Sequence, residues 1–229
     1  MPNVDRPFVS INMASTADGK ITSFRREEPK FTSRRDKKTM DRLRAESDAV
    51  LVGAGTLRAD DPPLQVRDAE MKAYRQSLGK PPGLVNILVT RSASVDPGSR
   101  FFRDERAADH IVATVEDAPA ENVARLADVA RVWTVGRGSV DLPELLRRLK
   151  GEGIARLLVE GGGDLNWGFV RADLVDEVYV TIAPALLGGR EAPTLCEGDG
   201  FTMAERKRLT LVSADVIDGE IFCRYAMIR

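Results

Sequence analysis

The stretch Leu158–Phe169, LVEGGGDLNWGF, runs from an apolar strand pattern through a carboxylate and three glycines into a helical pattern. Its beginning belongs to Arg156–Glu160, which is predicted to be a buried parallel strand, and Gly163–Arg171 is predicted to be the helix that follows. In open α/β sheets, ligands gather at the carboxyl ends of such strands. The stretch therefore indicates an α/β fold and places a candidate site at the turn.

The three glycines favour an anion at this turn. Gly161, Gly162 and Gly163 remove every Cβ, so backbone N–H groups can approach a phosphate closely, and the next helix offers its N-terminal dipole. A tight turn that needs a positive φ is the alternative, although one glycine usually suffices for it. The spacing is not the dinucleotide fingerprint, because position 166 is Asn166 and no acidic residue follows about twenty positions later at a strand end. Spacing alone indicates a nucleotide or sugar phosphate and leaves its identity open.

The rest of the chain alternates strands and helices. The predicted strands are Phe8–Met13, Ala49–Gly53, Leu84–Thr90, His110–Thr114, Arg131–Val135, Arg156–Glu160, Glu177–Ala183, Leu209–Val216 and Glu220–Ile228. The predicted helices are Ser33–Glu46, Ala69–Leu78, Ala118–Asp128, Leu142–Lys150 and Gly163–Arg171, with a short one near Thr56. The alternation predicts a single α/β domain over residues 1–229, with a mostly parallel sheet covered by helices on both faces. Asp218-Gly219 predicts a C-terminal antiparallel hairpin.

The composition argues against several classes of binding partner. Thirty-four basic and 35 acidic residues give the 229-residue chain a formal charge of -1, which argues against a nucleic-acid partner. The basic run Arg34–Lys38 is interpreted as a solvated helix face. No apolar run approaches the roughly 18 residues of a membrane span, and the N-terminal residues lack the pattern of a signal peptide. The sequence therefore predicts a cytoplasmic protein.

Cysteine and histidine usage argues against a metal site. Cys196 and Cys223 lie far apart in no metal-ligand spacing, and His110 is the only histidine. A zinc site or a histidine-based triad would depend on that one residue. We therefore expect no metal, and interpret Cys223 as a strand thiol in or near the core.

Two further segments hold candidate site residues. In Leu51–Arg67, Thr56 supplies a hydroxyl near a helix start, and Asp60-Asp61 favours a cap plus a polar ligand contact over a metal pair. Arg44 and Arg67 flank this segment and are either a phosphate clamp or surface arginines. Thr90-Arg91-Ser92 directly follows a strand, and its two hydroxyls and arginine suit the 2′-phosphate of an adenosine ribose.

Several motifs occur together and in order. They are Arg6-Pro-Phe-Val9, Ala17-Asp-Gly-Lys-Ile21, Leu43-Arg-Ala45, Asp48–Thr56, Arg58-Ala-Asp-Asp-Pro62 with Leu64 and Arg67, Leu158–Gly163, Leu174-Val-Asp-Glu177 and Ala183–Gly188. On these residues the chain resembles the riboflavin-biosynthesis pyrimidine reductase family over nearly its whole length. The resemblance implies a fold similar to that of dihydrofolate reductase. Some members carry an N-terminal zinc deaminase, but this chain has no H-x-E and no P-C-x-x-C, so it resembles the stand-alone reductase.

The resemblance implies an activity and a set of site residues. The family reduces the ribosylamino group of a pyrimidine ribosyl 5′-phosphate to ribitylamino with NADPH, by hydride delivery to C1′ of a ring-opened imine. The implied NADPH contacts are Ala14, Thr56, Asp60, Thr90, Arg91, Ser92, Val135, Gly161, Gly162, Gly163 and Asp164. The implied substrate contacts are Ser33, Arg44, Leu64, Arg67 and Glu160, and the implied catalytic residues are Lys20, Asp60 and Glu160. Members are commonly homodimers.

Two departures from the family pattern bear on the chemistry. Where the family has A-M-S-L-D-G-K, this chain has the less apolar Ala14-Ser-Thr-Ala-Asp-Gly-Lys20, and Ser23–Lys30 replaces a shorter approach to Thr32-Ser33. No residue is an obvious general acid, so Asp18, Asp60, Glu160 and a bound water stay open. Two other functions also stay open. One is a related NADPH-dependent reductase of a pterin or folate, and the other is a nucleotide-binding module without turnover.

Overall fold

The computed structural model describes residues 5–27 and 29–228, and the chain forms two compact units. The first unit takes in Lys38–Leu158 together with the residues up to Phe8, and the second comprises Val9–Lys37 and Val159–Arg229. Residues 1–4, which belong to the stretch tested for a signal peptide, and residue 28 of the Ser23–Lys30 loop lie outside the described residues. The prediction of one domain over residues 1–229 stays a prediction.

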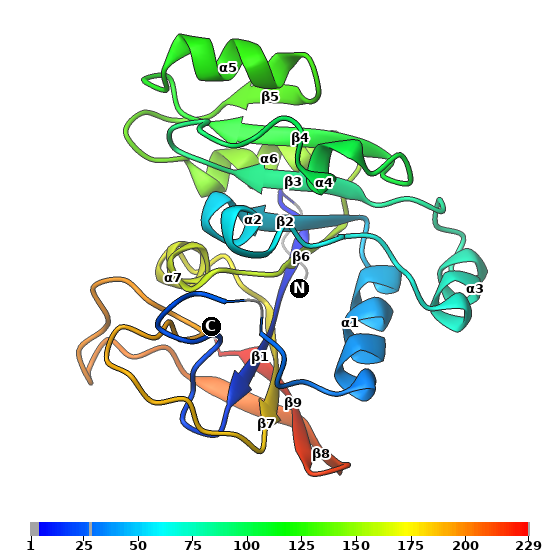
Figure 1. Ribbon diagram of the computed structural model, residues 1–229, viewed down its shortest axis with the longest axis vertical. Coiled ribbons are helices and arrows are strands. Elements are labelled where there is room, and N and C mark those ends of the chain that lie inside the picture. The colour runs from blue at the N-terminus through cyan, green and yellow to red at the C-terminus, as the bar shows by residue number, and fades with distance from the viewer. Residues whose placement is uncertain (1–4, 28, 229) are drawn as a thin grey trace. The chain divides into compact units, whose positions relative to one another are not determined.

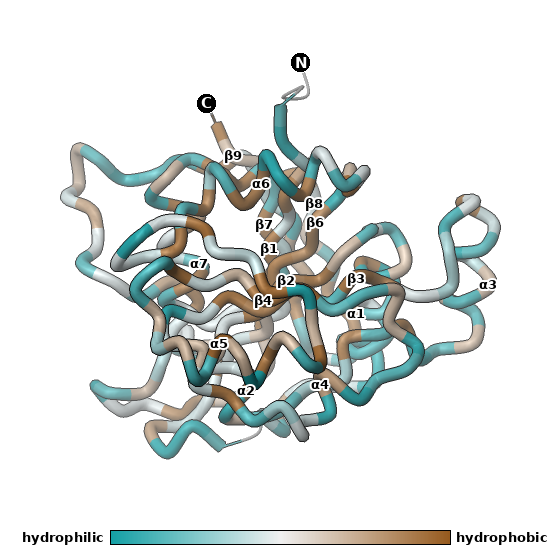
Figure 2. Tube along the Cα trace, turned by 90° about the horizontal axis from the view of Figure 1, so that it is seen from above, coloured by the Kyte–Doolittle hydropathy of each residue, from teal (hydrophilic) through white to brown (hydrophobic). Residues whose placement is uncertain are grey.

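The first unit contains a parallel sheet with the strand order β5-β4-β3-β2-β6 (Figure 1). Its strands are β2 (Ala49–Gly53), β3 (Val85–Val89), β4 (Asp109–Thr114), β5 (Arg131–Thr134) and β6 (Arg156–Val159), whose last residue belongs to the second unit. Ala49, Val50, Leu51 and Val52 have no exposed surface, so both faces of β2 are covered. In Figure 2, β2, β3 and β4 are among the more hydrophobic segments of the chain.

Helices of the first unit bury apolar stripes. They are α2 (Ala54–Asp60), α3 (Ala69–Ser77), α4 (Arg100–Arg103), α5 (Ala120–Ala127), α6 (Leu142–Gly151) and all but the first turn of α1 (Arg34–Glu46). Leu145, Leu146 and Leu149 of α6 have no exposed surface. The Asp141 carboxylate caps α6 by accepting the Glu144 N–H at 2.9 Å. The Glu144 side chain accepts from Arg148 at 2.7 Å instead of returning to the cap, so only half of a capping box forms.

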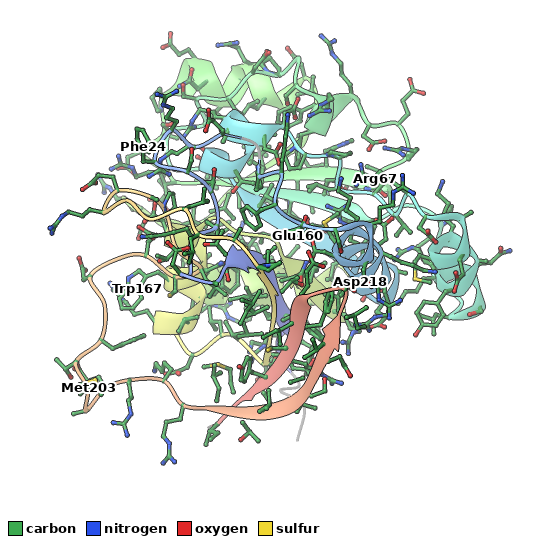
Figure 3. The ribbon with its side chains drawn as sticks, turned by 60° about the horizontal axis from the view of Figure 1, so that its bottom comes forward. Phe24, Arg67, Glu160, Trp167, Met203 and Asp218 are labelled. Carbon is green, nitrogen blue, oxygen red and sulfur yellow. The ribbon has the colours of Figure 1, made fainter. Side chains whose placement is uncertain are left out.

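The second unit has the strand order β1-β7-β9-β8, and it contains α7 (Gly163–Arg171). The strands are β1 (Phe8–Thr16), whose first residue belongs to the first unit, β7 (Glu177–Ala183), β8 (Leu209–Ile217) and β9 (Glu220–Met227). β1 and β7 pair in parallel, whereas β9 is antiparallel to both β7 and β8. The hairpin predicted at Asp218-Gly219 is confirmed, because both residues have positive φ, of 54° and 84°. Figure 3 labels Asp218 at this turn.

The predicted elements agree with the structure to within three residues at each end. β2, β7 and α7 match at both ends, while β1 continues to Thr16. α4 is not among the predicted helices. Cys223 is buried in β9, as expected.

Candidate functional site

The turn between β6 and α7 is built differently at each of its glycines. Gly161 has a φ of +82°, and a Cβ on it would lie 2.8 Å from Met13 Sδ. A Cβ on Gly163 would lie 2.6 Å from the carbonyl oxygen of Thr194, so this residue is a glycine because the chain packs against it. Gly161 and Gly163 are buried, whereas Gly162 is half-buried. Gly162 is therefore the glycine of this turn that a ligand can reach.

The start of α7 fits an anion. No side chain caps Gly162, so the N–H groups of the first helical turn are not satisfied by a cap. Asp164 in that turn is exposed. Unpaired N–H groups at a helix start, beside a residue without a Cβ, are the donors that the diphosphate of a dinucleotide needs. Glu160, labelled in Figure 3, precedes the turn and is half-buried.

The segment Thr194–Glu197 braces this turn, and sequence reasoning did not identify it. The Glu197 N–H donates to the Gly163 carbonyl at 3.1 Å, and Asn166 Nδ2 donates to the Leu195 carbonyl at 2.8 Å. The N–H and hydroxyl of Thr194 both donate to Glu197 Oε1, at 2.5 and 2.7 Å. The Thr194 N–H lowers the pKa of the Glu197 carboxyl, with its hydroxyl and the charges of Arg26 and Lys20 acting in the same direction. No sequence motif marks the two contacts between this segment and the turn, because they join residues about thirty positions apart.

The loop after β1 holds Asp18 and Lys20 in structural contacts. Asp18 accepts the Thr16 hydroxyl at 2.6 Å and the Gly188 N–H at 2.6 Å, and these two bonds lower the pKa of its carboxyl to about 2. The Lys20 ammonium donates to the Ala192 carbonyl at 2.9 Å. Asp18 is therefore ionised at neutral pH, which removes it from the possible proton donors. Ala14, on β1, is half-buried.

Ser33 lies at the start of α1, with its N–H and hydroxyl bound to Glu220 of β9 at 2.8 and 2.5 Å. Glu220 is 2% exposed. The Ser33 hydroxyl already donates its hydrogen to the buried Glu220 carboxylate. In the predicted substrate contact it would therefore act as an acceptor.

In the first unit, the residues predicted for the site in the segment after β2 have different environments. Thr56 is half-buried in α2, beside the exposed Gly55, and Asp60 is half-buried at the end of that helix. The cap predicted for Asp60-Asp61 forms on another helix, because the Asp61 carboxylate accepts the N–H groups of Arg100 and Phe101 in α4 at 2.7 and 3.1 Å. Leu64 is 1% exposed and belongs to the core.

Arg44 and Arg67 have different environments. The side chain of Arg44 is 2% exposed, donates to the Gln65 carbonyl at 3.3 Å and lies 3.8 Å from the Asp41 carboxylate. Arg67, labelled in Figure 3, is exposed, while the Asp41 carboxylate accepts its backbone N–H at 3.1 Å. Asp41 thus contacts both arginines, and only Arg67 presents its guanidinium to solvent.

A third group of residues lies at the carboxyl ends of β3 and β5. Thr90 and Val135 are buried, whereas Arg91 is exposed and Ser92 is half-buried. The Asn122 side chain donates to the Ser92 carbonyl at 3.0 Å. Parallel strands bring these residues to one edge because their carboxyl ends coincide.

Among the described residues, the structure has no group of three or more His, Cys, Asp or Glu side chains arranged to hold a metal ion. Within the same residues, no helix is long and apolar enough to cross a membrane.

The parallel pairing of the strands and the glycine turn at the carboxyl end of β6 are typical of α/β proteins that bind a nucleotide. The chain belongs to the RibD C-terminal domain family, which its sequence matches over residues 7–223. This result confirms the family predicted from the motifs.

Two relatives match nearly their whole length. The chain is 41% identical over 196 residues to the 2,5-diamino-6-ribosylamino-4(3H)-pyrimidinone 5′-phosphate reductase of Archaeoglobus fulgidus, covering 86% of this chain and 89% of that protein. It is 38% identical over 223 residues to the protein of the same name from Methanothermobacter thermautotrophicus, covering 97% and 99%.

Solved structures confirm the predicted fold class. A pyrimidine reductase-like protein from Corynebacterium diphtheriae superposes with a TM-score of 0.85 at 24% identity, covering 99% of this chain and 94% of that one. Dihydrofolate reductase from Enterococcus faecalis superposes with a TM-score of 0.51 at 11% identity, covering 97% of each chain. The fold is therefore similar to that of dihydrofolate reductase.

Proposed function

We propose that this chain is an oxidoreductase of riboflavin biosynthesis. It reduces the ribosylamino group of a pyrimidine ribosyl 5′-phosphate to ribitylamino, with NADPH as the hydride source. The observation that carries the proposal is the uncapped start of α7 beside Gly162, because it offers free N–H donors to a diphosphate. The names of the two relatives support the reaction, since both are reductases of a ribosylamino pyrimidinone phosphate.

The proposed NADPH contacts are those that the family resemblance implies, and each unit is taken by itself. On the second unit, Gly161, Gly162, Gly163 and Asp164 hold the pyrophosphate, and Ala14 contacts the nicotinamide. On the first unit, Arg91 and Ser92 are the accessible part of the predicted 2′-phosphate group, which also includes Thr90 and Val135. Thr56 and Asp60 complete the proposed nicotinamide contacts. Bound NADPH would supply the hydride, and the protein supplies position and electrostatics.

The proposed substrate contacts centre on Arg67. Its guanidinium is exposed and its backbone is fixed by Asp41, which suits it to bind a phosphate in bidentate fashion. Arg44, Leu64, Ser33 and Glu160 complete the proposed contacts, and Lys20, Asp60 and Glu160 remain the proposed catalytic residues. Because both relatives are named for the 2,5-diamino compound, we propose the aminated pyrimidine as the substrate.

The test is NADPH oxidation, followed by absorbance under anaerobic conditions with the aminated and deaminated substrates offered separately. We expect turnover of the aminated compound. Dihydrofolate, offered as a third substrate, tests the alternative of a folate or pterin reductase. NADPH binding without turnover of any of the three would identify a nucleotide-binding protein and overturn the proposal.

Replacing Arg67 with Ala tests the phosphate contact. We expect KM for the phosphorylated substrate to rise, because a charge-assisted hydrogen bond is lost, while turnover of the bare nucleoside hardly changes. Steady-state kinetics on the two substrates makes the comparison. Equal losses on both would remove Arg67 from the phosphate site.

We also propose that the protein is a homodimer assembled through β8. This edge strand exposes Leu209, Leu211, Val212 and Val216, by 43%, 53%, 48% and 75%. Its outer backbone edge and these apolar side chains fit a second copy of the same strand. A cytoplasmic location stays a prediction.

A further inference from the structure

The first turn of α1 departs from the pattern of its sequence. Ser33 and Asp36 have the S-x-x-D spacing of a capping box, and the Ser33 hydroxyl accepts the N–H groups of Arg35 and Asp36 at 3.0 and 3.2 Å. In such a box the carboxylate of the third helical residue returns to the N–H of the cap residue. In this protein, another residue accepts that N–H.

Glu220 replaces Asp36 at the cap. Its carboxylate accepts the Ser33 N–H at 2.8 Å and the Ser33 hydroxyl at 2.5 Å. Glu220 is the first residue of β9 and is 2% exposed, so a buried carboxylate from a distant strand performs the capping. The Asp36 carboxyl is therefore available for a different role.

Asp36 turns toward the interior of the second unit. Its neighbours Arg34, Arg35 and Lys37 are exposed, as expected for a solvated helix face, but Asp36 is half-buried. Its carboxyl is hydrogen-bonded by the hydroxyls of Thr181 on β7 and of Thr32. Two further acids, Glu220 of β9 and Glu160 directly after β6, are near enough for their charges to act on it.

This environment favours the protonated acid. Burial, and then the charges of Glu220 and Glu160, raise the pKa of the Asp36 carboxyl, whereas the two hydroxyls act in the opposite direction. A carboxylate in the first turn of a helix is ordinarily favoured in its charged form by the helix dipole. Asp36 thus departs from the usual behaviour of its position, while Asp18 is held ionised by its hydrogen bonds.

We propose that Asp36 is the proton donor of the reduction, an inference that rests on the proposed function. As the hydride adds to C1′ of the imine, the electron pair of the C=N bond moves to nitrogen, and the Asp36 proton forms the new N–H bond. The imine is reduced to the amine and the nicotinamide is oxidised to NADP⁺. Asp36 is left as a carboxylate and regains a proton from solvent before the next turnover.

The first test compares wild type with Asp36→Asn, which keeps the size of the side chain but removes its proton. In wild type we expect kcat to fall as the pH rises through the pKa of Asp36, because only the acid donates. In Asp36→Asn we expect kcat at pH 6 to be about 100-fold lower and this pH dependence to disappear. The Kd of NADPH and the Tm are expected to stay near those of wild type. The matched control is Glu70→Gln, an exposed acid in the first turn of α3, which should leave all these quantities unchanged.

A second variant tests the environment of the acid. Thr181→Val keeps the shape of the side chain and removes a hydroxyl that favours the ionised form. We expect the fall in kcat to move to higher pH. A carboxyl-carbon NMR titration of the protein without substrate should place the pKa of Asp36 above its ordinary value of 3.8 and show the same displacement in the variant.

The outcomes separate the two proposals. An active wild type whose kcat and pH profile survive in Asp36→Asn would overturn the role of Asp36 and leave the reductase intact. An Asp36 that titrates at or below its ordinary pKa would do the same. A wild type that reduces none of the substrates would overturn the proposed function, and this inference with it.

Discussion

Gly162 and Gly163 are adjacent glycines with different roles. We expect Gly162→Asp to abolish NADPH binding while the protein stays folded, because the new carboxylate stands where the pyrophosphate is proposed to lie. We expect Gly163→Ala to destabilise the fold by about 1–3 kcal/mol, because its Cβ meets the Thr194 backbone. Fluorescence titration with NADPH and thermal unfolding measure the two effects, and each variant is the control for the other. Unchanged affinity in folded Gly162→Asp would remove the pyrophosphate from this turn.

Arg75 is a residue whose role is structural. It is 1% exposed, and its guanidinium donates to the carbonyls of Arg44, Ala45, Ser47, Pro81 and Gly83 at 2.6–3.3 Å. Burial lowers its pKa and the charge of Asp48 raises it. One planar group with five N–H donors thus joins backbone carbonyls from the end of α1 to those of the Pro81–Gly83 loop.

We expect Arg75→Met to lower the free energy of unfolding by at least about 3 kcal/mol, because several buried carbonyls lose their donor. Arg75→Lys should recover only part of this loss, since an ammonium has three donors in a different geometry. Urea unfolding gives the values. Arg147→Met, which removes an exposed arginine from α6, is the control and should change stability by less than about 1 kcal/mol. Equal effects at the two positions would contradict the structural role of Arg75.

The sequence indicated the residue types of the candidate site but not the roles of single residues. Three glycines after a strand predicted an anion-binding turn, and only packing distinguishes the accessible Gly162 from Gly161 and Gly163. Gly161 packs against Met13 and Gly163 packs against Thr194, and both of these residues lie far away in the sequence. Asp36 was assigned to a solvated face for the same reason, because nothing near it in sequence shows that Glu220 takes its place at the cap.

At the scale of the element, α4 is made by contacts that a sequence pattern does not show. It has four residues, too few to show a helical period, and it forms because Asp61 caps it while Phe101 and Phe102 are buried. Longer elements were predicted because their period was clear, as in β7 and α7. Local periodicity fixes such elements, whereas α4 depends on the distant Asp61 carboxylate and on the burial of Phe101 and Phe102.

We expect Asp61→Ala to loosen α4. Asp61 has a φ of 39°, in the left-handed region that an alanine adopts at a cost, and its carboxylate is the helix cap. The combined loss should be about 2 kcal/mol. Faster hydrogen exchange of the Arg100 and Phe101 amides would report it. Asp61→Asn should keep most of the protection, because asparagine tolerates this φ and retains an acceptor, and protection that survives in the alanine variant would show that the cap is not needed.

At the scale of the whole molecule, β8 leads to a prediction about assembly. Val216→Lys places a charge on the most exposed apolar side chain of this edge strand, and we expect it to convert the proposed dimer into a monomer. Light scattering after size-exclusion chromatography gives the mass. Met203→Lys is the matched control, because Met203 is 78% exposed in the same unit but lies outside β8. A wild type that elutes as a monomer would refute the dimer.

The parallel pairing of β1 with β7 has a consequence for synthesis of the protein. The Val9 N–H binds the Asp176 carboxylate, 167 positions later in the chain. Ribosomes add about 5–20 residues per second, so roughly 8–33 seconds pass between the two residues. Val9 and Ile11 have no exposed surface in the folded protein. During this time they belong to a strand whose partner β7 has not yet been made. The nascent chain must therefore keep the apolar residues of β1 from aggregating until β7 has been translated.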